Sequence, residues 1–351
     1  MRPLKIGYWP LISSLDCPGD RRRIVFWAKS RGHIITQDLS ENVDVIVASE
    51  NADFNSPIFS ETKKPIILDL VDSYLSPLNK IDDLARGVAK KFARQLRGPV
   101  KPFSLHVKDF CVKSKIVVCS SIEQSLVVSQ FNKNIHIILD SHNEIPFLDY
   151  AQRESLSVQA NSILWEGQPG TIGGVKQISE SLRIIAIKHD IEFEFLTDQT
   201  YFKLLNKYFK RSTRELIKKD LGAIGEKARI ISWSPENLFV ASLRARVAMI
   251  PIDLSIPMQR LKPENRLLIM WRMGLPCLTS PSEAYRRVAN KAGVNVVCEN
   301  SNEWLLEFLK ILEDPHHGRE QVLRGQNYLR DNHNELILLK KWDDAIESAM
   351  S

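Results

Sequence analysis

The chain has 351 residues, of which 44% are hydrophobic and 26% are charged, an ordinary composition for a globular protein. It excludes disorder for most of the chain, and the length suits two domains of about 150–200 residues better than one small core. A net charge of +6 and an isoelectric point near 9.0 favour partners that carry phosphate, such as nucleotides, lipids or nucleic acids, without choosing among them.

Localisation and redox state follow from the apolar runs and the cysteines. The amino-terminal segment MRPLKIGYWP lacks an apolar stretch of signal-peptide length, and no apolar run reaches the roughly 18 residues of a membrane helix. We therefore expect a cytoplasmic protein that can still associate with a membrane surface. Five cysteines without a Cys-x-x-Cys pair predict reduced and mostly buried thiols rather than disulfides or a zinc site.

Short apolar runs alternate with helical patterns through the first half of the chain. The runs that predict strands are 5–10, 33–36, 43–49, 65–71, 115–120 and 135–140. Because these runs are unbroken, they predict a parallel sheet covered on both faces. Residues 19–32 predict a helix that ends at Gly32. This alternation is typical of a doubly wound α/β domain.

A second series of elements begins near residue 162. Strands are predicted over 162–167, 191–196, 228–233, 247–252, 275–280 and 294–299. Helices are predicted over 170–190, 201–220, 235–245, 262–274 and 280–293, and from residue 301 to the end. A polar segment without sheet pattern, residues 145–161, separates the two series.

These elements predict an α/β fold of two Rossmann-like domains that face each other across a cleft. We place the domains at residues 1–155 and 156–335, and expect residues 336–351 to form a helix that packs back on the first domain. In such folds ligands bind at the carboxyl ends of the strands, so the cleft between the domains is the expected site.

Four glycines follow the first strand of the second domain, in the segment GQPGTIGG (167–174). Glycines such as Gly167 and Gly170 let backbone N–H groups approach a phosphate, and the N-terminus of the next helix favours negative charge. The spacing differs from the G-x-G-x-x-G fingerprint. A purely structural turn therefore remains the alternative.

A more informative segment spans residues 255–288. Lys262 precedes a helix that opens with Pro-Glu-Asn and ends at Gly274, after which a strand restarts. A lysine at a helix N-terminus beside a cleft can neutralise a pyrophosphate. A solvated lysine is the alternative.

The run K-P-E-N-R-L-L-x-x-W-x-M-G-L-P (262–276), with a serine-rich turn and Tyr285 after it, resembles the donor-binding segment of glycosyltransferases of the GT-B fold, family 4 or group 1. The preceding block (233–253) and the later helices (303–332) are also similar to that family. The resemblance covers roughly residues 160–345, and the first half matches in pattern only. It implies a nucleotide-sugar donor domain over 156–335 and an acceptor domain over 1–155.

The resemblance also implies roles for individual residues. Lys262 would contact the donor phosphates, and Glu264, Asn265 and Arg266 would lie beside the nucleotide at the helix start. The backbone at Gly167 would let the pyrophosphate come close. Two further residues would line the donor pocket, namely Ser280 and Tyr285. The nucleotide sugar is a substrate, so no cofactor is expected.

The sequence departs from the family at one position. Many retaining members carry a Glu-x7-Glu motif whose second glutamate binds the ribose and lies five residues before a glycine. In this chain the glycine is Gly274, and the position of the second glutamate is occupied by Ile269. Glu264 or Asn265 would then take the ribose contact. Whether the reaction retains or inverts the anomeric configuration stays open.

The chain contains no Asp-x-Asp pair, the usual holder of a divalent ion in the other main glycosyltransferase fold. This fits a metal-independent reaction in which cationic side chains stabilise the departing nucleotide diphosphate. Lys262 is the first candidate for this role and Arg266 the second.

An acceptor hydroxyl needs a base when the reaction inverts configuration. Asp72, which follows a predicted strand in the first domain, is the main candidate, and Asp16 and His33 are others. Asp72 can instead cap the next helix, and His33 can begin a strand. His142 lies near the expected hinge and is equally compatible with a structural role.

Residues 86–115 hold nine basic residues against one acidic residue, with Phe92, Leu96, Phe103 and Phe110 among them. A basic amphipathic segment can lie on an anionic membrane, which would bring a lipid-linked acceptor within reach. A solvated helix face with a buried aromatic side is the alternative.

Two other functions remain in view. A sugar-nucleotide epimerase would use the same donor without an acceptor, and would need more acid–base groups. A non-catalytic nucleic-acid-binding protein would explain the charge, but no motif with stacked aromatic and basic residues is present.

Overall fold

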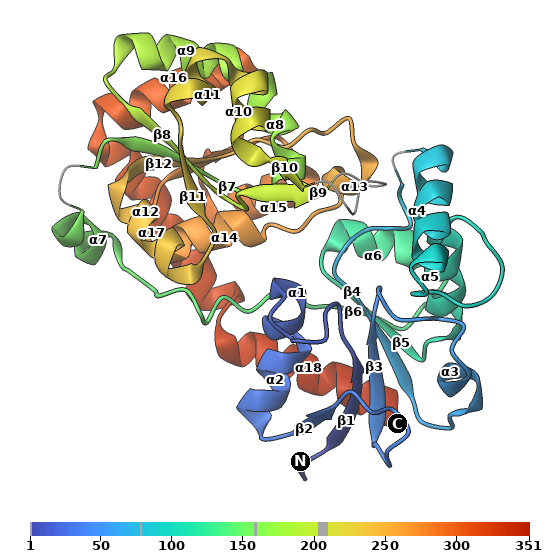
Figure 1. Cartoon of the computed structure of the whole chain (residues 1–351). Helices are drawn as coiled ribbons and strands as arrows, with labels where there is room; N and C mark the ends of the chain where they lie inside the picture. Colours follow the sequence, from blue (N-terminus) through green and yellow to red (C-terminus); the bar gives the residue numbers. More distant parts are fainter. Residues whose placement is uncertain (1, 78, 158–159, 203–209) are drawn as a thin grey trace. The chain divides into compact units, whose positions relative to one another are not determined.

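The computed structural model describes residues 2–77, 79–157, 160–202 and 210–351. The chain divides into two compact units (Figure 1). Unit 1 comprises Met1–Asn143, Ile256–Pro263 and Asn334–Ser351, and unit 2 comprises Glu144–Ser255 and Glu264–His333. Each unit contains a parallel sheet between helices, which confirms the α/β class and the two Rossmann-like domains.

Two segments of the chain belong to a different unit from the one that the predicted boundaries give them. The helix α7 (Tyr150–Leu156) belongs to unit 2 rather than to the first domain, because the Arg153 guanidinium donates to the Ser242 carbonyl at 2.9 Å. Residues 256–263 belong to unit 1, where the Ser121 hydroxyl donates to the Leu261 carbonyl at 2.7 Å. The chain first passes from unit 1 to unit 2 at Asn143/Glu144, whereas the sequence places the boundary at residue 155.

The sheet of unit 1 has six parallel strands in the order β2-β1-β3-β4-β5-β6. The strands are β1 (Lys5–Trp9), β2 (Ile34–Thr36), β3 (Val45–Ser49), β4 (Ile66–Leu70), β5 (Ile116–Cys119) and β6 (Ile135–Ile137). Ile46 is paired with Ile66, and Ile67 with Ile116. The strands β3, β4 and β5 are buried along their full length, as expected for a sheet with helices on both faces.

Successive residues of these strands point to opposite faces, and each face has its own core. The helices are α1 (Pro18–Arg21), α2 (Ile24–Arg31), α3 (Pro57–Glu61), α4 (Lys80–Phe92), α5 (Phe103–Lys113), α6 (Ile122–Val128), α13 (Pro257–Arg260) and α18 (Glu335–Met350). Val45 and Val47 pack with α2 and α18, whereas Ile46 and Ala48 pack with α3, α5 and α6.

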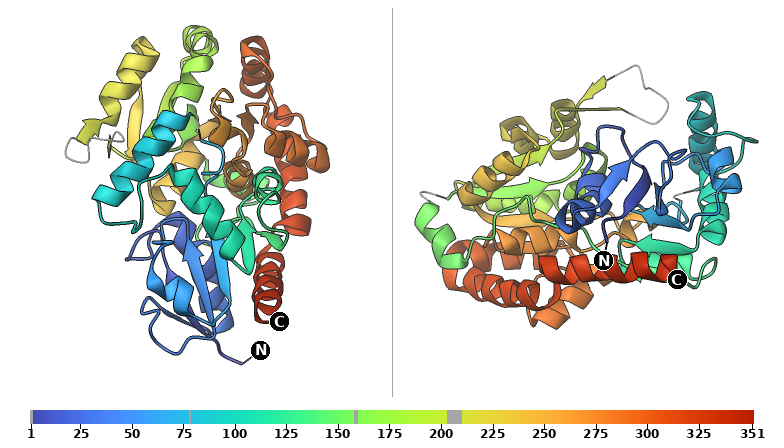
Figure 2. Two further views of the ribbon diagram at one scale, coloured as in Figure 1. Left: turned by 90° about the vertical axis from the view of Figure 1, so that its right-hand side faces the viewer. Right: turned by 90° about the horizontal axis from the view of Figure 1, so that it is seen from below.

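The C-terminal helix α18 is part of unit 1 and lies against its strands (Figure 2). Trp342 is buried in that core, and the next residue, Asp343, accepts a hydrogen bond from the Trp27 indole at 2.7 Å. Arg31 also pairs with Asp343, at 2.5 Å. The last helix thus completes a face of a sheet built mainly from the first 140 residues.

The sheet of unit 2 has five parallel strands in the order β11-β8-β7-β12-β13. The strands are β7 (Ser162–Glu166), β8 (Glu192–Thr197), β11 (Arg229–Ser232), β12 (Ala245–Ile250) and β13 (Cys277–Thr279). Val297 adds a single parallel bridge to Thr279. A separate antiparallel hairpin consists of β9 (Thr200–Phe202) and β10 (Lys210–Ser212).

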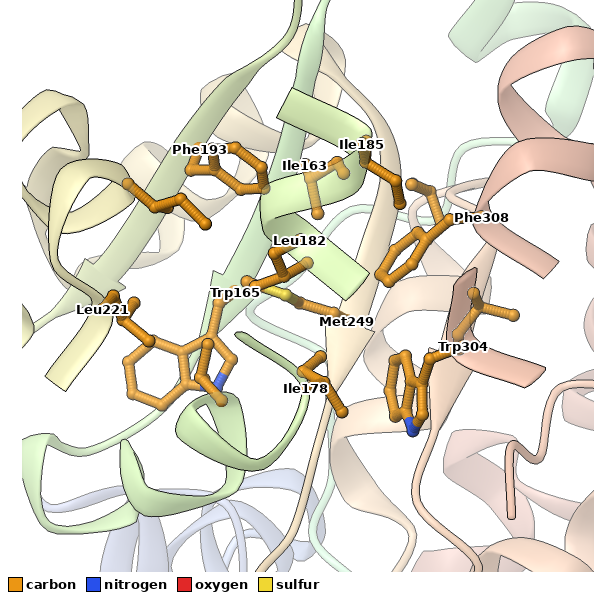
Figure 3. Close-up of a cluster of buried hydrophobic side chains, with 14 of the residues drawn as sticks. Ile163, Trp165, Ile178, Leu182, Ile185, Phe193, Leu221, Met249, Trp304 and Phe308 are labelled. Carbon is orange, nitrogen blue, oxygen red and sulfur yellow. The ribbon is translucent and has the colours of Figure 1, made fainter. Parts of the chain in front are cut away.

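Helices cover both faces of this sheet as well. They are η1 (Pro169–Thr171), α8 (Gly173–Gln177), α9 (Ser179–Lys188), α10 (Thr213–Leu221), α11 (Ala223–Lys227), α12 (Pro235–Arg244), α14 (Asn265–Arg272), α15 (Glu283–Ala292), α16 (Ser301–Glu313) and α17 (Pro315–Asn332). Figure 3 shows the core on one face, where Trp165 and Met249 from the strands meet Leu182 of α9 and Phe308 of α16. The helices α12 and α14 contact the strands as well.

Several predicted elements differ from the observed ones. The helix predicted over 19–32 is interrupted at Arg23, whose backbone is not helical (φ −118°, ψ −112°), and it ends at Gly32 as expected. The helix predicted over 170–190 breaks at Ile178. The helix predicted over 201–220 is wrong at its start, because the hairpin strands precede α10, and residues 203–209 lie outside the described residues.

Four of the five cysteines are buried, which confirms the burial predicted from the cysteine pattern. Among the described residues, no helix is both long and apolar enough to span a bilayer.

Candidate functional site

The carboxyl ends of the strands in unit 2 form an edge that carries uncharged polar groups and the carboxylates of Glu166, Asp198 and Asp253. Glu166 ends β7, and its side chain accepts a hydrogen bond at 2.9 Å from the indole of Trp233, which follows β11. Ser280 follows β13 and accepts from the backbone N–H of Ile252 at 2.8 Å. One bond joins the ends of β7 and β11 and the other joins the ends of β12 and β13, and because β7 and β12 are neighbours in the sheet the two pairs form one polar platform.

The glycine-rich segment lies directly after β7, at this edge. A Cβ atom on Gly167 would lie 2.8 Å from the Trp165 ring, and one on Gly174 would lie 2.4 Å from the Pro251 carbonyl oxygen. Gly170, by contrast, has nothing within 4 Å of a Cβ position. Gly167 and Gly174 thus serve close packing, whereas the backbone at Gly170 is open to an approaching group.

The start of α14 lies in the same unit. Glu264 is buried, and its carboxylate pairs with the Arg287 guanidinium at 3.0 Å. Arg266 donates to the backbone carbonyl of Glu166 at 3.2 Å, which fixes α14 against the end of β7. Arg266 also lies near the buried Tyr285 hydroxyl. Burial raises the pKa of this hydroxyl, and the guanidinium only partly opposes the shift. Two of the predicted donor residues, Arg266 and Tyr285, are thus neighbours.

Several buried polar atoms near this edge have no hydrogen-bond partner within the described part of the chain. They include the Thr197 hydroxyl, at the end of β8, and the side-chain oxygen of Asn265, at the start of α14. Buried polar groups are nearly always paired in folded proteins. A polar ligand at this edge would satisfy them.

A cavity of about 330 Å³ lies next to Ser280. Its wall is lined by Gln177 of α8, Ile178 between α8 and α9, Leu254 after β12, and Asn300 and Trp304 at α16. The cavity is within unit 2 and mixes apolar and polar side chains, as small-molecule sites usually do.

The strand ends of unit 1 carry ionisable groups instead. Asp72 lies two residues after β4, and its carboxylate pairs with the Lys262 ammonium at 3.2 Å. Both side chains are about one third exposed. Lys262 belongs to unit 1, whereas Glu264, Asn265 and Arg266 belong to unit 2.

Glu50 lies behind this pair, directly after β3, and it is buried. Its carboxylate accepts a hydrogen bond from the Val71 N–H at 2.9 Å. Burial, together with the nearby negative charge of Asp72, raises the pKa of Glu50 to about 8. A protonated carboxylic acid at neutral pH thus lies beside the Asp72–Lys262 pair.

A second set of charges in unit 1 is fully enclosed. The Arg23 guanidinium, which has no exposed surface, donates to the Asp69 carboxylate at 2.6 Å and to the Ile138 carbonyl at 2.6 Å. Asp20 accepts from the Tyr8 hydroxyl at 2.5 Å and from the Leu11 N–H at 2.8 Å. These bonds hold the loop after β1 and the junction of α1 and α2, so we assign them a structural role.

The other predicted base candidates do not join Asp72. Asp16 is exposed, and its backbone carbonyl accepts from Arg21. The His33 ring accepts from the Leu4 N–H at 3.2 Å and packs on Trp27, and burial lowers its pKa. His142 is buried. Among the described residues, no group of three His, Cys, Asp or Glu side chains is arranged to hold a metal ion.

Sequence reasoning missed Glu50 and the Glu166–Trp233 hydrogen bond. A signal existed for both carboxylates, because each lies at the end of an otherwise apolar strand. The partner Trp233 could not be found in this way, because it lies 67 residues farther along the chain.

No protein-family model matches the chain, and no curated protein matches it. Solved structures do match. TarM aligns with a TM-score of 0.57 and 10% identity over 86% of this chain and 54% of TarM, so the chain spans about half the length of that protein. HepE from Anabaena, solved with UDP and glucose, aligns with a TM-score of 0.60 and 12% identity over 98% of this chain and all of HepE.

A protein named as a UDP-N-acetylglucosamine 2-epimerase from Listeria monocytogenes also aligns, with a TM-score of 0.54 and 12% identity over 99% of this chain and 96% of that protein. TarM and HepE are glycosyltransferases of the GT-B fold. At these identities the likeness concerns the fold, and it confirms the expected GT-B architecture of two Rossmann-like domains.

Proposed function

We propose that this chain is a metal-independent glycosyltransferase that moves a sugar from a nucleotide-sugar donor to a glycan or lipid-linked acceptor. One observation carries the proposal. The GT-B fold is combined with two different strand edges, one polar and glycine-rich in unit 2, and one with an ionisable carboxylate–lysine pair in unit 1. Transfer of a sugar to an acceptor needs both a binding site for the diphosphate and a general base that accepts the proton of the acceptor hydroxyl.

The donor is assigned to unit 2. The open backbone at Gly170 and the side chain of Arg266 supply donors for a diphosphate, while Asn265 and the platform around Ser280 supply polar contacts for the rest of the donor. HepE was solved with UDP and glucose, and S. aureus TarM with Fondaparinux, alpha-GlcNAc-glycerol and UDP. These ligands support a UDP-sugar as the first donor to test.

Glu264 has a smaller role in this proposal than its position at the helix start suggested. Its carboxylate already accepts from Arg287 and is buried. Asn265, whose side-chain oxygen has no partner in the described residues, is the better group for a ribose hydroxyl.

The chemistry is assigned to the Asp72–Lys262 pair. Asp72 takes the proton of the acceptor hydroxyl as that oxygen forms the new bond to the sugar. The bond between the sugar and the diphosphate breaks, and the nucleoside diphosphate leaves with the bonding electrons. Arg266 stabilises the negative charge that develops on it, so a cationic side chain takes the role of a divalent ion. No cofactor takes part.

Donor binding is the first test. UDP in excess should raise the melting temperature of the protein, since a ligand that binds only the folded state stabilises it. Arg266→Ala should weaken UDP binding by about 1–3 kcal/mol, the usual scale for a charged hydrogen bond. Arg183→Ala, an exposed arginine on α9, is the control and should bind normally. No stabilisation by any nucleoside diphosphate would exclude the function.

An epimerase is the second candidate, because the Listeria protein aligns over nearly its whole length. The two functions separate in one assay with a UDP-sugar labelled in the sugar. Transfer moves the label to a glycan or lipid acceptor and releases UDP. Epimerisation converts the labelled donor into its epimer without any acceptor.

A further inference from the structure

The outward face of α4 carries an apolar stripe that the structure leaves exposed. Ile81 is 80% exposed, Leu84 43% and Phe92 83%, and Val88 between them is half-buried. These residues occur at positions i, i+3, i+7 and i+11 of one helix, so they share one face. An exposed apolar face of this kind marks an interaction surface.

The opposite face of α4 holds the helix to unit 1. The Asp83 carboxylate accepts from the Ser104 N–H at 2.9 Å, at the start of α5. Gly87 lies so close to the segment before α5 that a Cβ atom on it would come to 2.0 Å from the Lys101 carbonyl oxygen. Figure 1 shows α4 and α5 side by side on unit 1. The stripe is therefore the outer side of a helix that is firmly packed.

Positive charge outweighs negative charge around the stripe, although Asp82 at the start of α4 is an exposed acid. Residues 86–115 carry nine basic residues and one acid, a net charge of +8 in a chain whose total is +6. The rest of the chain is therefore slightly acidic. Lys80 and Arg94, at the two ends of α4, are exposed, and the Lys91 ammonium contacts a backbone carbonyl, that of Gly98, at 2.6 Å rather than a carboxylate.

We propose that the outer face of α4, defined by Ile81, Leu84, Val88 and Phe92, docks on an anionic membrane surface. Apolar side chains enter the boundary between head groups and acyl chains, and flanking lysines and arginines interact with anionic head groups. The charge complementarity selects this partner over a second copy of the chain, whose equally basic surface would be repelled. The apolar stripe selects it over a nucleic acid, which is bound through phosphates and needs no such stripe.

The docking face is connected to the proposed acceptor edge. The helix α4 begins eight residues after Asp72, and the Lys90 ammonium donates at 2.8 Å to Asn51, which follows Glu50. The guanidinium of Arg86 lies over the Tyr74 ring at 4.7 Å. Membrane docking would thus bring the acceptor edge to the lipid surface. This consequence rests on the proposed function and favours a lipid-linked acceptor over a soluble glycan.

Docking itself is tested without any enzymatic assay, by co-sedimentation of the full chain with vesicles. We expect binding to vesicles of phosphatidylcholine and phosphatidylglycerol, and little binding to phosphatidylcholine alone. The variant Ile81→Asp/Phe92→Asp should lower binding at least tenfold, because it places charges where acyl chains would be. Ile187→Asp, on α9 of unit 2 and 74% exposed in the wild type, should bind as the wild type does.

A charge-reversal pair sharpens the test. Lys91→Glu/Arg94→Glu should weaken binding to anionic vesicles, whereas Lys218→Glu/Lys219→Glu, on exposed positions of α10, should not.

Equal binding by the Ile81→Asp/Phe92→Asp variant, or no vesicle binding by the wild type, would overturn the proposal. A wild-type dimer that this variant dissociates would assign the stripe to self-association, and tight DNA binding that reversal of Lys91 and Arg94 abolishes would assign the charge to nucleic acid. The rise in melting temperature with UDP is measured on the same variants. A variant that loses vesicle binding but is still stabilised by UDP has lost docking and not donor binding.

Discussion

The two sheets share one architecture but end in opposite chemistry. In unit 1 the strand ends present Glu50, Asp72 and the Lys262 that pairs with it. In unit 2 they present a hydrogen-bonded polar platform that includes Glu166, four glycines around a strand–helix turn, and one arginine, Arg266. The difference teaches that the fold supplies two equivalent edges, and that the residues at the ends of the strands decide what each edge does.

This comparison suggests a division of labour. A carboxylate beside a cation is suited to proton transfer, whereas open backbone near a helix start is suited to holding a diphosphate. Variants at the strand ends of unit 1 should therefore change catalysis or its pH dependence. Variants at the strand ends of unit 2 should change donor binding.

The largest expected effect is on activity. Asp72→Asn removes the proposed base but keeps the shape of the side chain, and should lower the transfer rate about 10²- to 10⁴-fold, the usual contribution of general-base catalysis. Binding of UDP should stay within about twofold, because the donor is assigned to unit 2. The assay is initial-rate transfer from a labelled UDP-sugar, alongside calorimetric titration with UDP. A rate like that of the wild type would remove Asp72 from the mechanism.

The next largest effect is on the stability of unit 1. Arg23→Met leaves the Asp69 carboxylate buried without its cation, which should cost about 3–5 kcal/mol of unfolding free energy. Urea denaturation measures it. Arg183→Met breaks the exposed pair with Glu180 on α9 and should change stability little. Equal stability of the two variants would contradict a structural role for the enclosed ion pair.

A pH effect should distinguish unit 1 from unit 2. Glu50 has a pKa of about 8 in the folded protein, whereas the ordinary value of a glutamate is 4.5. The folded state therefore holds a proton that the unfolded state releases, and stability should fall as pH rises from about 5 to 8, by up to about 1.4 kcal/mol per pH unit. Glu50→Gln, a neutral side chain of the same shape, should flatten this slope. Denaturation midpoints at several pH values provide the measurement, and an unchanged slope would refute the raised pKa.

The smallest expected effect lies in the glycine turn of unit 2. Gly174→Ala would bring a Cβ atom to 2.4 Å from the Pro251 carbonyl oxygen, and should destabilise by about 1–3 kcal/mol and weaken UDP binding as α8 shifts. Gly173→Ala is a matched control in the same helix, because its nearest contact is 4.0 Å away, at Asp253. Thermal unfolding with and without UDP compares the two. If both variants behave alike, the close approach at Gly174 is unimportant.

Local pattern was sufficient for most of the secondary structure. Unbroken apolar runs predicted β3, β4, β5 and β7 because a sheet buried on both faces needs apolar residues at every position. Pattern failed where tertiary contacts override local preference. Arg23 interrupts a predicted helix where its side chain reaches Asp69, 46 residues farther along the chain.

The candidate site was predictable only in part. Asp72, Arg266 and Tyr285 could be named as candidates because each lies at a strand end or in a segment with a family pattern. The residues that contact them could not be named. Lys262 was assigned to phosphate contact from its position before α14, and the structure adds that it pairs with Asp72, 190 positions away in sequence but in the same unit.

The sequence by itself determined that this protein has two α/β domains, that its cysteines are mostly buried, and that its positive charge is concentrated in one segment. These properties depend on composition and on the periods of 2 and 3.6 residues, which are local. Only the tertiary structure decided that residues 256–263 and the last helix belong to unit 1, that Glu50 is buried beside Asp72, and that the apolar side of α4 faces outward. The physical reason is that burial, and the pKa shifts it causes, depend on which distant segments pack together, and no local pattern specifies them.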